Sequence, residues 1–402
     1  MMESLKSLIP ELTDTLRNGI LPFWIGLEDR VRGGFFGRVD GTGVLHPDAP
    51  KGVVMHARIL WTFSAACRLF GDPAYRAAVE AAKACLLGNF CDQEYGGVYW
   101  TISADGRPLE TKKQFYGLSF AIYGLSEYYR ATGDREALDA AVRLYGEIEH
   151  HAFDPQYDGY FEASDRTWNL LDDMRLSDKD ANEKKTMNTH LHILEAYTNL
   201  YRVWPDPDLW RQLANLLRLF LRRLLSPSTN HLGLFFGERW EDRSEGVYSY
   251  GHDIEASWLL FEAAEVIGDP ALMQEVLSRT AALGRAALEG YMSDGSMAYE
   301  GNAEGITDRE RHWWVQAETM VGLYYLSAFH GEERAAAMLL DTWDYIKSHL
   351  IDRESGEWFW SIRADGGVNL DDDKAGIWKC PYHNGRMCLE LLERLGGVPE
   401  RK

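Results

Sequence analysis

The chain has 402 residues, 46% of them hydrophobic, and a formal net charge of −20 from 62 acidic and 42 basic side chains. Such acidity repels phosphate backbones and argues against nucleic acid as a partner. The first residues lack the basic start and apolar core of an export signal, and no stretch approaches 18 uninterrupted apolar residues. We therefore expect a soluble, cytoplasmic protein with no membrane partner.

Cysteine and aromatic usage narrows the expected chemistry. The five cysteines are odd in number and show no paired metal-binding spacing, which indicates reduced thiols. The chain also contains 14 Trp, 20 Tyr and 16 Phe. Most of these rings belong to the core, but aromatic faces also stack on sugars while carboxylates and amides bind sugar hydroxyls. A small polar ligand is compatible with this composition.

Apolar residues recur at helical spacing along the whole chain and predict twelve helices. They cover approximately 3–18, 55–70, 74–89, 114–131, 135–150, 186–203, 207–224, 253–267, 270–288, 312–330, 332–349 and 383–395. Short turns such as Gly71-Asp72-Pro73 and Gly268-Asp269-Pro270 separate the members of several pairs. Glycine ends the first helix of such a pair, and Asp with Pro begins the second.

Longer connections between the pairs alternate glycine with aromatic residues, as in 33–37, 96–100 and 356–360. Two of them continue into Ala-Asp-Gly, at 104–106 and 364–366, which predicts hairpins with tight turns. The resulting repeat of about sixty residues favours one catalytic domain over 1–402. The fold class predicted is all-α, an (α/α)6 barrel with short β-hairpins in the long loops at one rim. An open solenoid is the alternative.

If alternate helices form the inner ring, the inner helices are 55–70, 114–131, 186–203, 253–267, 312–330 and 383–395. Each begins just after a long loop, so all six N-termini open at one rim. Six of the 12 histidines lie near these starts: His56, His190, His192, His252, His312 and His383. This recurrence predicts a site at that rim.

Helix geometry indicates which of these side chains share a face. Asn188 and His192 are four residues apart and lie together, whereas His190 points about 160° away from His192. By the same arithmetic His252, Glu255 and Trp258 span an arc of about 120°. Trp314 pairs with Glu318 at a spacing of four residues.

Several histidines around a cavity suggest either a metal site or proton transfer. A metal site is disfavoured because no HExxH-like pair or compact carboxylate cluster lies on any one helix. Histidine titrates near neutral pH, so two imidazoles on opposite sides of a carbon could remove a proton and return it on the other face. Arg58 is the natural partner of the oxyanion that forms. Structural hydrogen bonding remains the alternative for each residue alone.

Four motifs resemble the N-acylglucosamine 2-epimerase superfamily, and within it the cellobiose 2-epimerase group. They are Asn188-Thr-His-Leu-His192, Tyr250-Gly-His252-Asp-Ile-Glu255-Ala-Ser-Trp258, Arg311-His-Trp-Trp314-Val-Gln-Ala-Glu318 and Trp378-Lys-Cys-Pro-Tyr-His383-Asn-Gly-Arg-Met. The opening Leu21-Pro-Phe-Trp24 and the run 33–37 fit the same group. The similarity therefore covers nearly the whole chain.

The resemblance implies an isomerase that epimerises C2 of a free reducing sugar through a cis-enediolate, with no metal and no organic cofactor. His252 and His383 are then the acid/base pair, His192 assists ring opening and proton shuttling, and Arg58 stabilises the enediolate. The residues implied to bind sugar are Tyr116, Asn188, Glu255, Trp258, Trp314, Glu318 and Trp378. Asp180 is expected to hold the sugar or the surroundings of His252. The partner expected is a small sugar, and the protein a monomer or homodimer.

Within this resemblance the expected reaction converts cellobiose to glucosyl-mannose and lactose to epilactose. Mannose 2-epimerisation or isomerisation, or N-acylglucosamine 2-epimerisation, are alternatives on the same scaffold. Glycoside hydrolysis, which (α/α)6 barrels also support, would need two facing carboxylates from Glu255, Glu318 and Asp180. It would leave the histidines without a role. A non-catalytic sugar-binding protein is the remaining possibility.

Overall fold

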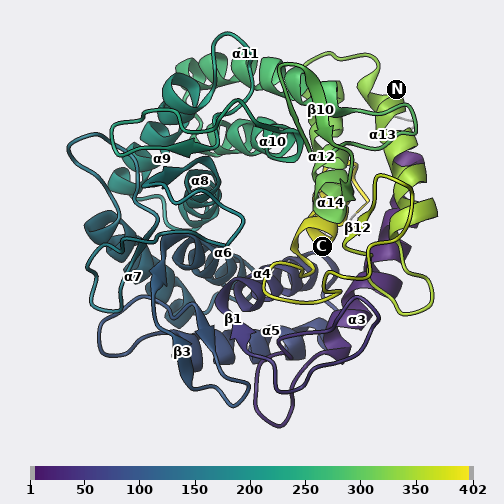
Figure 1. Ribbon diagram of the computed structural model, residues 1–402. Coiled ribbons are helices and arrows are strands. Elements are labelled where there is room, and N and C mark those ends of the chain that lie inside the picture. Colours follow the sequence, from purple (N-terminus) through teal and green to yellow (C-terminus); the bar gives the residue numbers. More distant parts are fainter. Residues whose placement is uncertain (1–4, 398–402) are drawn as a thin grey trace.

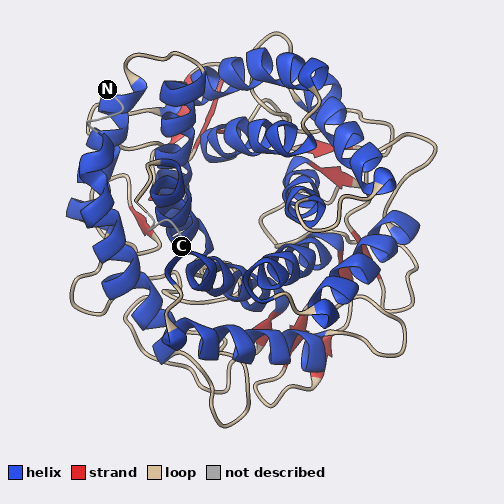
Figure 2. Ribbon diagram, turned by 180° about the vertical axis from the view of Figure 1, so that it is seen from behind, coloured by secondary structure: helices blue, strands red, loops and turns tan. Residues whose placement is uncertain are grey.

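The structure is a computed structural model that describes residues 5–397, and two concentric rings of helices form it (Figures 1 and 2). The inner ring consists of α4 (Val53–Phe70), α6 (Phe115–Thr132), α8 (Met187–Tyr201), α10 (Tyr250–Ile267), α12 (Trp313–Phe329) and α14 (Tyr382–Arg394). The outer ring consists of α2 (Ile9–Asp14), α3 (Leu21–Gly26), α5 (Pro73–Cys85), α7 (Arg135–His151), α9 (Pro207–Leu219), α11 (Pro270–Ala287) and α13 (Ala335–Tyr345). The predicted (α/α)6 barrel is confirmed.

The ring closes where the two ends of the chain meet, so the open solenoid is wrong. The last inner helix, α14, packs against both α4 and α12, and α2 packs on its outer side. Trp24 donates its Nε1 hydrogen to Glu357 at 2.6 Å, and Trp343 donates to Glu11 at 2.7 Å. The N-terminal helices therefore complete the sixth pair. Within residues 5–397 no helix combines the length and apolar character needed to cross a bilayer.

The turns inside the pairs follow the prediction. Gly71 and Gly268 end α4 and α10 in the left-handed region, with φ of 66° and 70°. Asp72 and Asp269 then accept backbone N–H groups of α5 and α11. These caps satisfy helix-end groups that would otherwise lack partners.

The helix boundaries differ from the prediction in three ways. First, α10 begins at Tyr250 rather than 253, which places His252 inside the helix. Second, the first helix, expected over 3–18, continues to Gly26, and its residues 3–4 lie outside the described residues. Third, π-helical turns interrupt or end outer helices: η2 (Thr15–Ile20), η3 (Leu86–Phe90), η4 (Phe220–Leu224) and η6 (Ile346–Leu350). The wider turn at η2 precedes Pro22, which lacks a backbone N–H.

Short strands join each repeat to the next. The pairs are β1 (Lys51–Gly52) with β2 (Thr101–Ile102), β2 with β3 (Pro108–Glu110), β4 (Lys113–Gln114) with β5 (Ala163–Ser164), β6 (Lys185–Thr186) with β7 (Phe235–Phe236), β8 (Tyr248–Ser249) with β9 (Glu300–Asn302), β9 with β10 (Gly305–Asp308), and β11 (Arg311–His312) with β12 (Ser361–Ile362). All are antiparallel. The predicted tight turns are present, with Gly106 at φ 89° and Gly366 at φ 90°.

The fourth residue of several inner helices holds the loop that precedes the helix. His56, His190, Asp253 and Gln316 accept the backbone N–H groups of Phe35, Tyr160, Leu232 and Met297 at 3.1, 2.9, 2.9 and 2.8 Å. His56 and His190 also donate from Nδ1 to backbone carbonyls at 2.9 and 2.6 Å. These side chains point away from the barrel axis. His56 and His190 therefore hold the loops in place, and burial lowers the pKa of each to about 4.

Four long connections bury a lysine on an aspartate. The pairs are Lys51–Asp29, Lys113–Asp92, Lys185–Asp154 and Lys374–Asp352. Lys185 also donates to the carbonyls of Asp158 and Glu238 at 2.7 and 2.8 Å. Since buried charges are tolerated only when they are paired, each lysine fixes the loop that carries its aspartate.

We predict that Lys185→Met destabilises the protein by about 3–5 kcal/mol, because Asp154 would be left buried without its cation. The matched change Arg135→Met removes an exposed pair with Asp139 and should cost less than about 1 kcal/mol. Denaturant unfolding of both variants measures the difference. Equal stability of the two variants would contradict a structural role for the buried pair.

Candidate active site

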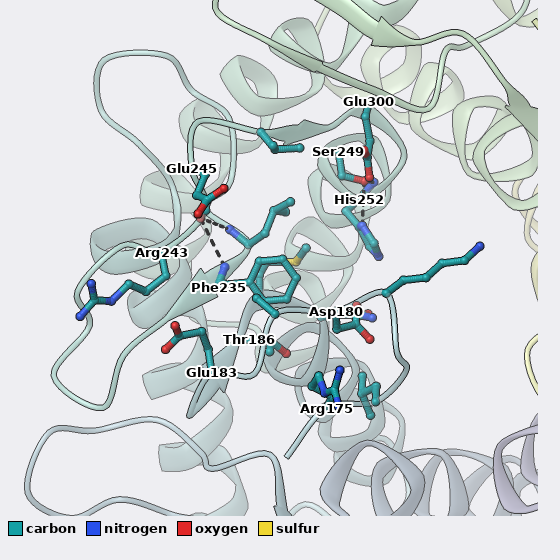
Figure 3. A pocket seen from close by; sticks show the side chains of 18 of the residues that line it. Arg175, Asp180, Glu183, Thr186, Phe235, Arg243, Glu245, Ser249, His252 and Glu300 are labelled. Carbon is teal, nitrogen blue, oxygen red and sulfur yellow. Dashed lines mark hydrogen bonds between the residues drawn. The ribbon is translucent and has the colours of Figure 1, made fainter. Parts of the chain in front are cut away.

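A cavity of about 1080 Å³ opens where α8, α10 and α12 begin. Three of the predicted site residues line it: Asn188, His252 and Asp180. Figure 3 shows this cavity with His252 and Ser249 from α10 and the preceding strand, and with Asp180 and Arg175 from the loop before α8. Several carboxylates line it, among them Glu183, Glu245 and Glu300. The other predicted residues lie among the inner helices, mostly buried.

The second and sixth positions of the inner helices supply most of the predicted site. Residues four apart share one face of a helix, so these positions point inward together. They hold Tyr116, Asn188, Trp314 and His383 at position two and Arg58, His192, Glu255 and Glu318 at position six. His252 occupies position three of α10.

Two of the predicted histidines are held by carboxylates through Nδ1. His383 Nδ1 lies 2.6 Å from Glu318, and His192 Nδ1 lies 2.9 Å from Glu195. A carboxylate accepts hydrogen bonds, so each Nδ1 carries the hydrogen and Nε2 is left without one, able to accept a proton. Burial and the nearby Arg58 lower the pKa of His383 well below its usual value. The neutral imidazole is therefore favoured at neutral pH.

His252 is held differently, by a hydroxyl group. Its Nδ1 lies 2.8 Å from Ser249 Oγ, and Ser249 also caps the start of α10. Burial lowers the pKa of His252 to about 3, and the nearby His192 contributes to the shift. The Trp314 ring contacts both His252 and His383, with centroid distances of 4.8 and 5.6 Å. Both imidazoles thus border one indole.

Arg58 brings a buried positive charge to the same site. It donates to the Tyr116 hydroxyl at 2.8 Å and to the Trp378 carbonyl at 3.4 Å. Its guanidinium lies over the rings of Phe120 and Tyr382, at 4.1 and 4.5 Å from their centroids. Among the described residues it bonds to no carboxylate, and its Nε is buried without a partner. It is therefore available to an anionic ligand.

The carboxylates Glu255 and Glu318 meet a second guanidinium, that of Arg386. Its Nη2 lies 2.7 Å from Glu255 and 2.6 Å from Glu318. Trp258, predicted to bind sugar, donates from Nε1 to Glu318 at 3.0 Å. Burial raises the pKa of both carboxyls, that of Glu255 to about 7 with Glu318 adding to the shift.

The same groups are the donor set that a metal ion would use. Glu255, Glu318 and His383 offer ligand atoms within 4.8 Å of one another. These residues lie on α10, α12 and α14, so the spacing of residues along any one helix does not reveal the cluster. Arg386 already supplies a positive charge to both carboxylates, and His383 directs Nδ1 to Glu318, so the chemistry of this donor set does not fit a metal ion.

The remaining predicted sugar-binding residues are Tyr116, Trp378, Asn188 and Asp180. The Tyr116 ring contacts His192 at 5.0 Å and Trp378 at 5.9 Å. Asn188 lines the cavity, and its Oδ1 is buried without a partner among the described residues. Asp180 accepts hydrogen bonds from Ser177 and also lines the cavity. No contact joins Asp180 to His252 in the described structure.

Four residues of this network had no role predicted from the sequence: Glu195, Ser249, Tyr382 and Arg386. Tyr382 donates to Glu195 at 2.5 Å, and Arg386 also bonds to Glu195. Glu195 follows His192 by three residues, a helical spacing that could have identified it. Arg386 is part of a motif that carried the resemblance, but its partners lie on α8, α10 and α12.

The chain is similar to known proteins over nearly its whole length. Residues 34–385 match the family described as N-acylglucosamine 2-epimerase (GlcNAc 2-epimerase). The cellobiose 2-epimerase of Bacteroides fragilis is 56% identical over 95% of this chain and 98% of its own length. That of Ruminococcus albus is 39% identical over 96% and 99%.

A solved structure extends the likeness to three dimensions. The cellobiose 2-epimerase from Bacillus thermoamylovorans B4167 superposes with a TM-score of 0.90 at 42% identity, over 96% of this chain and 99% of that chain. The family match, the full-length relatives and the shared barrel lead to one conclusion: this chain belongs to the N-acylglucosamine 2-epimerase family.

Proposed function

We propose that this protein is a carbohydrate 2-epimerase that interconverts glucose and mannose at the reducing end of a β-1,4-linked disaccharide. Cellobiose and lactose are the substrates expected, giving glucosyl-mannose and epilactose. The observation that carries this proposal is the placement of His252 and His383 against one indole, Trp314, each imidazole held through Nδ1. Two bases so placed suit removal and return of a proton on opposite faces of one carbon.

The chemistry follows from the open form of the sugar. Opening the ring gives an aldehyde, which acidifies the hydrogen on C2. One imidazole takes that proton at Nε2, leaving a cis-enediolate, and rotation about C2–C3 presents the other face. The negative charge of the enediolate raises the pKa of the second imidazole, which takes a proton from solvent and delivers it to C2. The first imidazole returns its proton to solvent, so protons balance.

Arg58 is the group best placed to stabilise the enediolate. A buried guanidinium with no carboxylate partner among the described residues lowers the energy of an anion where water is excluded. Tyr116 shares this role through its hydrogen bond to Arg58. His192, held by Glu195, is assigned to ring opening and proton shuttling.

The space at the rim supports a disaccharide rather than a monosaccharide. Its volume of about 1080 Å³ slightly exceeds the range of about 300–1,000 Å³ typical of small-molecule pockets. Polar side chains such as Asn188 and Asp180 line it and are assigned to sugar hydroxyls. Relatives that are 56% and 39% identical to this chain, and a solved structure that is 42% identical, are named cellobiose 2-epimerases. Glycoside hydrolysis is less favoured, because Glu255 and Glu318 bond to Arg386.

Incubation with cellobiose in heavy water tests the proposal. We expect NMR to show the mannose-type epimer with deuterium at C2, since the returned proton comes from solvent. Parallel incubations with lactose, mannose and N-acetylmannosamine separate the alternatives by substrate. A ketose product would indicate isomerisation, and release of glucose from cellobiose would indicate hydrolysis.

Replacing either proposed base should abolish most turnover. We predict that His252→Gln and His383→Gln each lose about 10²–10⁴-fold in kcat, the contribution typical of a general acid or base. The control His349→Gln changes a histidine on η6, in the outer ring, whose Nδ1 bonds to the Tyr345 carbonyl. Circular dichroism establishes folding in each case. Retained activity in a folded His383 variant would refute the assignment.

We predict that Arg58→Lys also loses at least about tenfold in kcat/KM, because a compact ammonium cannot reproduce the two-pronged guanidinium contact. The loss should appear mainly in kcat if the contact forms with the enediolate rather than with the sugar. Steady-state kinetics on cellobiose measures both parameters. Wild-type kinetics in this variant would rule out enediolate stabilisation by Arg58.

A further inference from the structure

We propose that Arg386 is a positioning residue that fixes the hydrogen-bonding state of two site histidines, His192 and His383, at the same time. Arg386 is the fifth residue of α14, on the turn that carries His383. The proposal rests on the proposed epimerase function for its kinetic consequences. The expected effect of Arg386 on the two histidines follows from the contacts within the protein and does not depend on the activity.

One guanidinium contacts the carboxylates that hold both imidazoles. Arg386 Nη1 bonds to Glu195 Oε1, and the other oxygen of Glu195 lies 2.9 Å from His192 Nδ1. Arg386 Nη2 lies 2.6 Å from Glu318 Oε1, the same oxygen that lies 2.6 Å from His383 Nδ1. The two imidazoles, on α8 and α14, are therefore linked through a single side chain.

The charge of Arg386 favours the ionised form of these carboxylates, which accepts hydrogen bonds. A carboxyl group that becomes protonated turns one acceptor oxygen into a donor, and the Nδ1–H tautomer would lose its partner. Burial acts to raise the pKa of Glu195, but Arg386 and His192 outweigh it and lower that pKa to about 2. At Glu318 burial outweighs Arg386 and raises the pKa, and the guanidinium limits that rise. Without the guanidinium, three carboxylates from different helices would lie together uncompensated, and protonation would relieve their repulsion.

Arg386 differs from Arg58 because protein carboxylates already occupy its two terminal nitrogens, Nη1 and Nη2, which are therefore not available to a substrate. Both of these nitrogens bond to carboxylates, and the plane lies over Trp258 and Tyr382 at 4.6 and 4.1 Å. The Nε of Arg386, like that of Arg58, is buried without a partner among the described residues, so the difference between the two arginines lies in their terminal nitrogens. The side chain of Arg386 is 2% exposed. It therefore acts through the histidines, and its loss should lower kcat while KM for cellobiose stays close to the wild-type value.

The experiment compares Arg386→Met, Arg386→Lys and the control Arg394→Met. Arg394 lies on the same helix two turns later, where it bonds to Glu265 and Glu390. Imidazole nitrogen NMR of the substrate-free variants reports which nitrogen carries the hydrogen. His56 and His190 serve as internal references, because their Nδ1 hydrogens bond to backbone carbonyls and do not depend on Arg386.

We expect wild type to show the Nδ1–H form at His192 and His383, and Arg386→Met to lose it at both while the references stay unchanged. The kcat for cellobiose should fall at least about 10²-fold, with an intermediate loss in Arg386→Lys and none in Arg394→Met. If Arg386→Met does not fold, Arg386→Lys carries the same test, since an ammonium cannot span three carboxylates.

Unchanged tautomers at His192 and His383 in a folded Arg386 variant would overturn the proposal, whatever the activity. The spectra need no substrate, so this outcome is separate from a failure of the proposed function, which would appear as absent turnover in wild type. A loss of kcat with unchanged tautomers would likewise assign Arg386 some other role.

Discussion

Three carboxylates lie inside the ring of inner helices, and one guanidinium makes their burial possible. Glu195, Glu255 and Glu318 come from α8, α10 and α12 and meet Arg386 from α14. A buried carboxylate without a cation would be expensive, so the site depends on these four helices keeping their relative positions. The histidines depend on it in turn, because two of these carboxylates hold their Nδ1 atoms.

The site thus uses its two buried arginines for different purposes. Both terminal nitrogens of Arg386 bond to protein carboxylates, whereas Arg58 bonds to a hydroxyl and a carbonyl and, among the described residues, to no carboxylate. The charge of Arg386 is compensated by carboxylates of the protein, and these ion pairs link α14 to α8, α10 and α12. The charge of Arg58 has no carboxylate partner among the described residues, as its proposed role in stabilising the enediolate requires. The two buried arginines therefore differ in whether carboxylates of the protein compensate their charge.

Much of this architecture could be predicted from the sequence, and the exceptions have physical reasons. Glycine and Asp-Pro turns marked the helix pairs, and the four-residue spacing of Asn188 and His192 placed them on one face. The start of α10 was missed because Gly251 weakens the helical pattern that Ser249 caps. Arg386 was not assigned a role because Glu255 and Glu195 lie 131 and 191 residues away along the chain. No local spacing reports such contacts.

The closure of the ring has a consequence for how the protein is made. The N-terminal helices pack on α14, the last helix described, and α14 carries both His383 and Arg386. During synthesis the earlier helix pairs leave the ribosome while the gap between α4 and α12 is still unfilled. The polar interior of the barrel is therefore incompletely covered until α14 has been synthesised. The pocket is complete only when α14 fills the gap between α4 and α12.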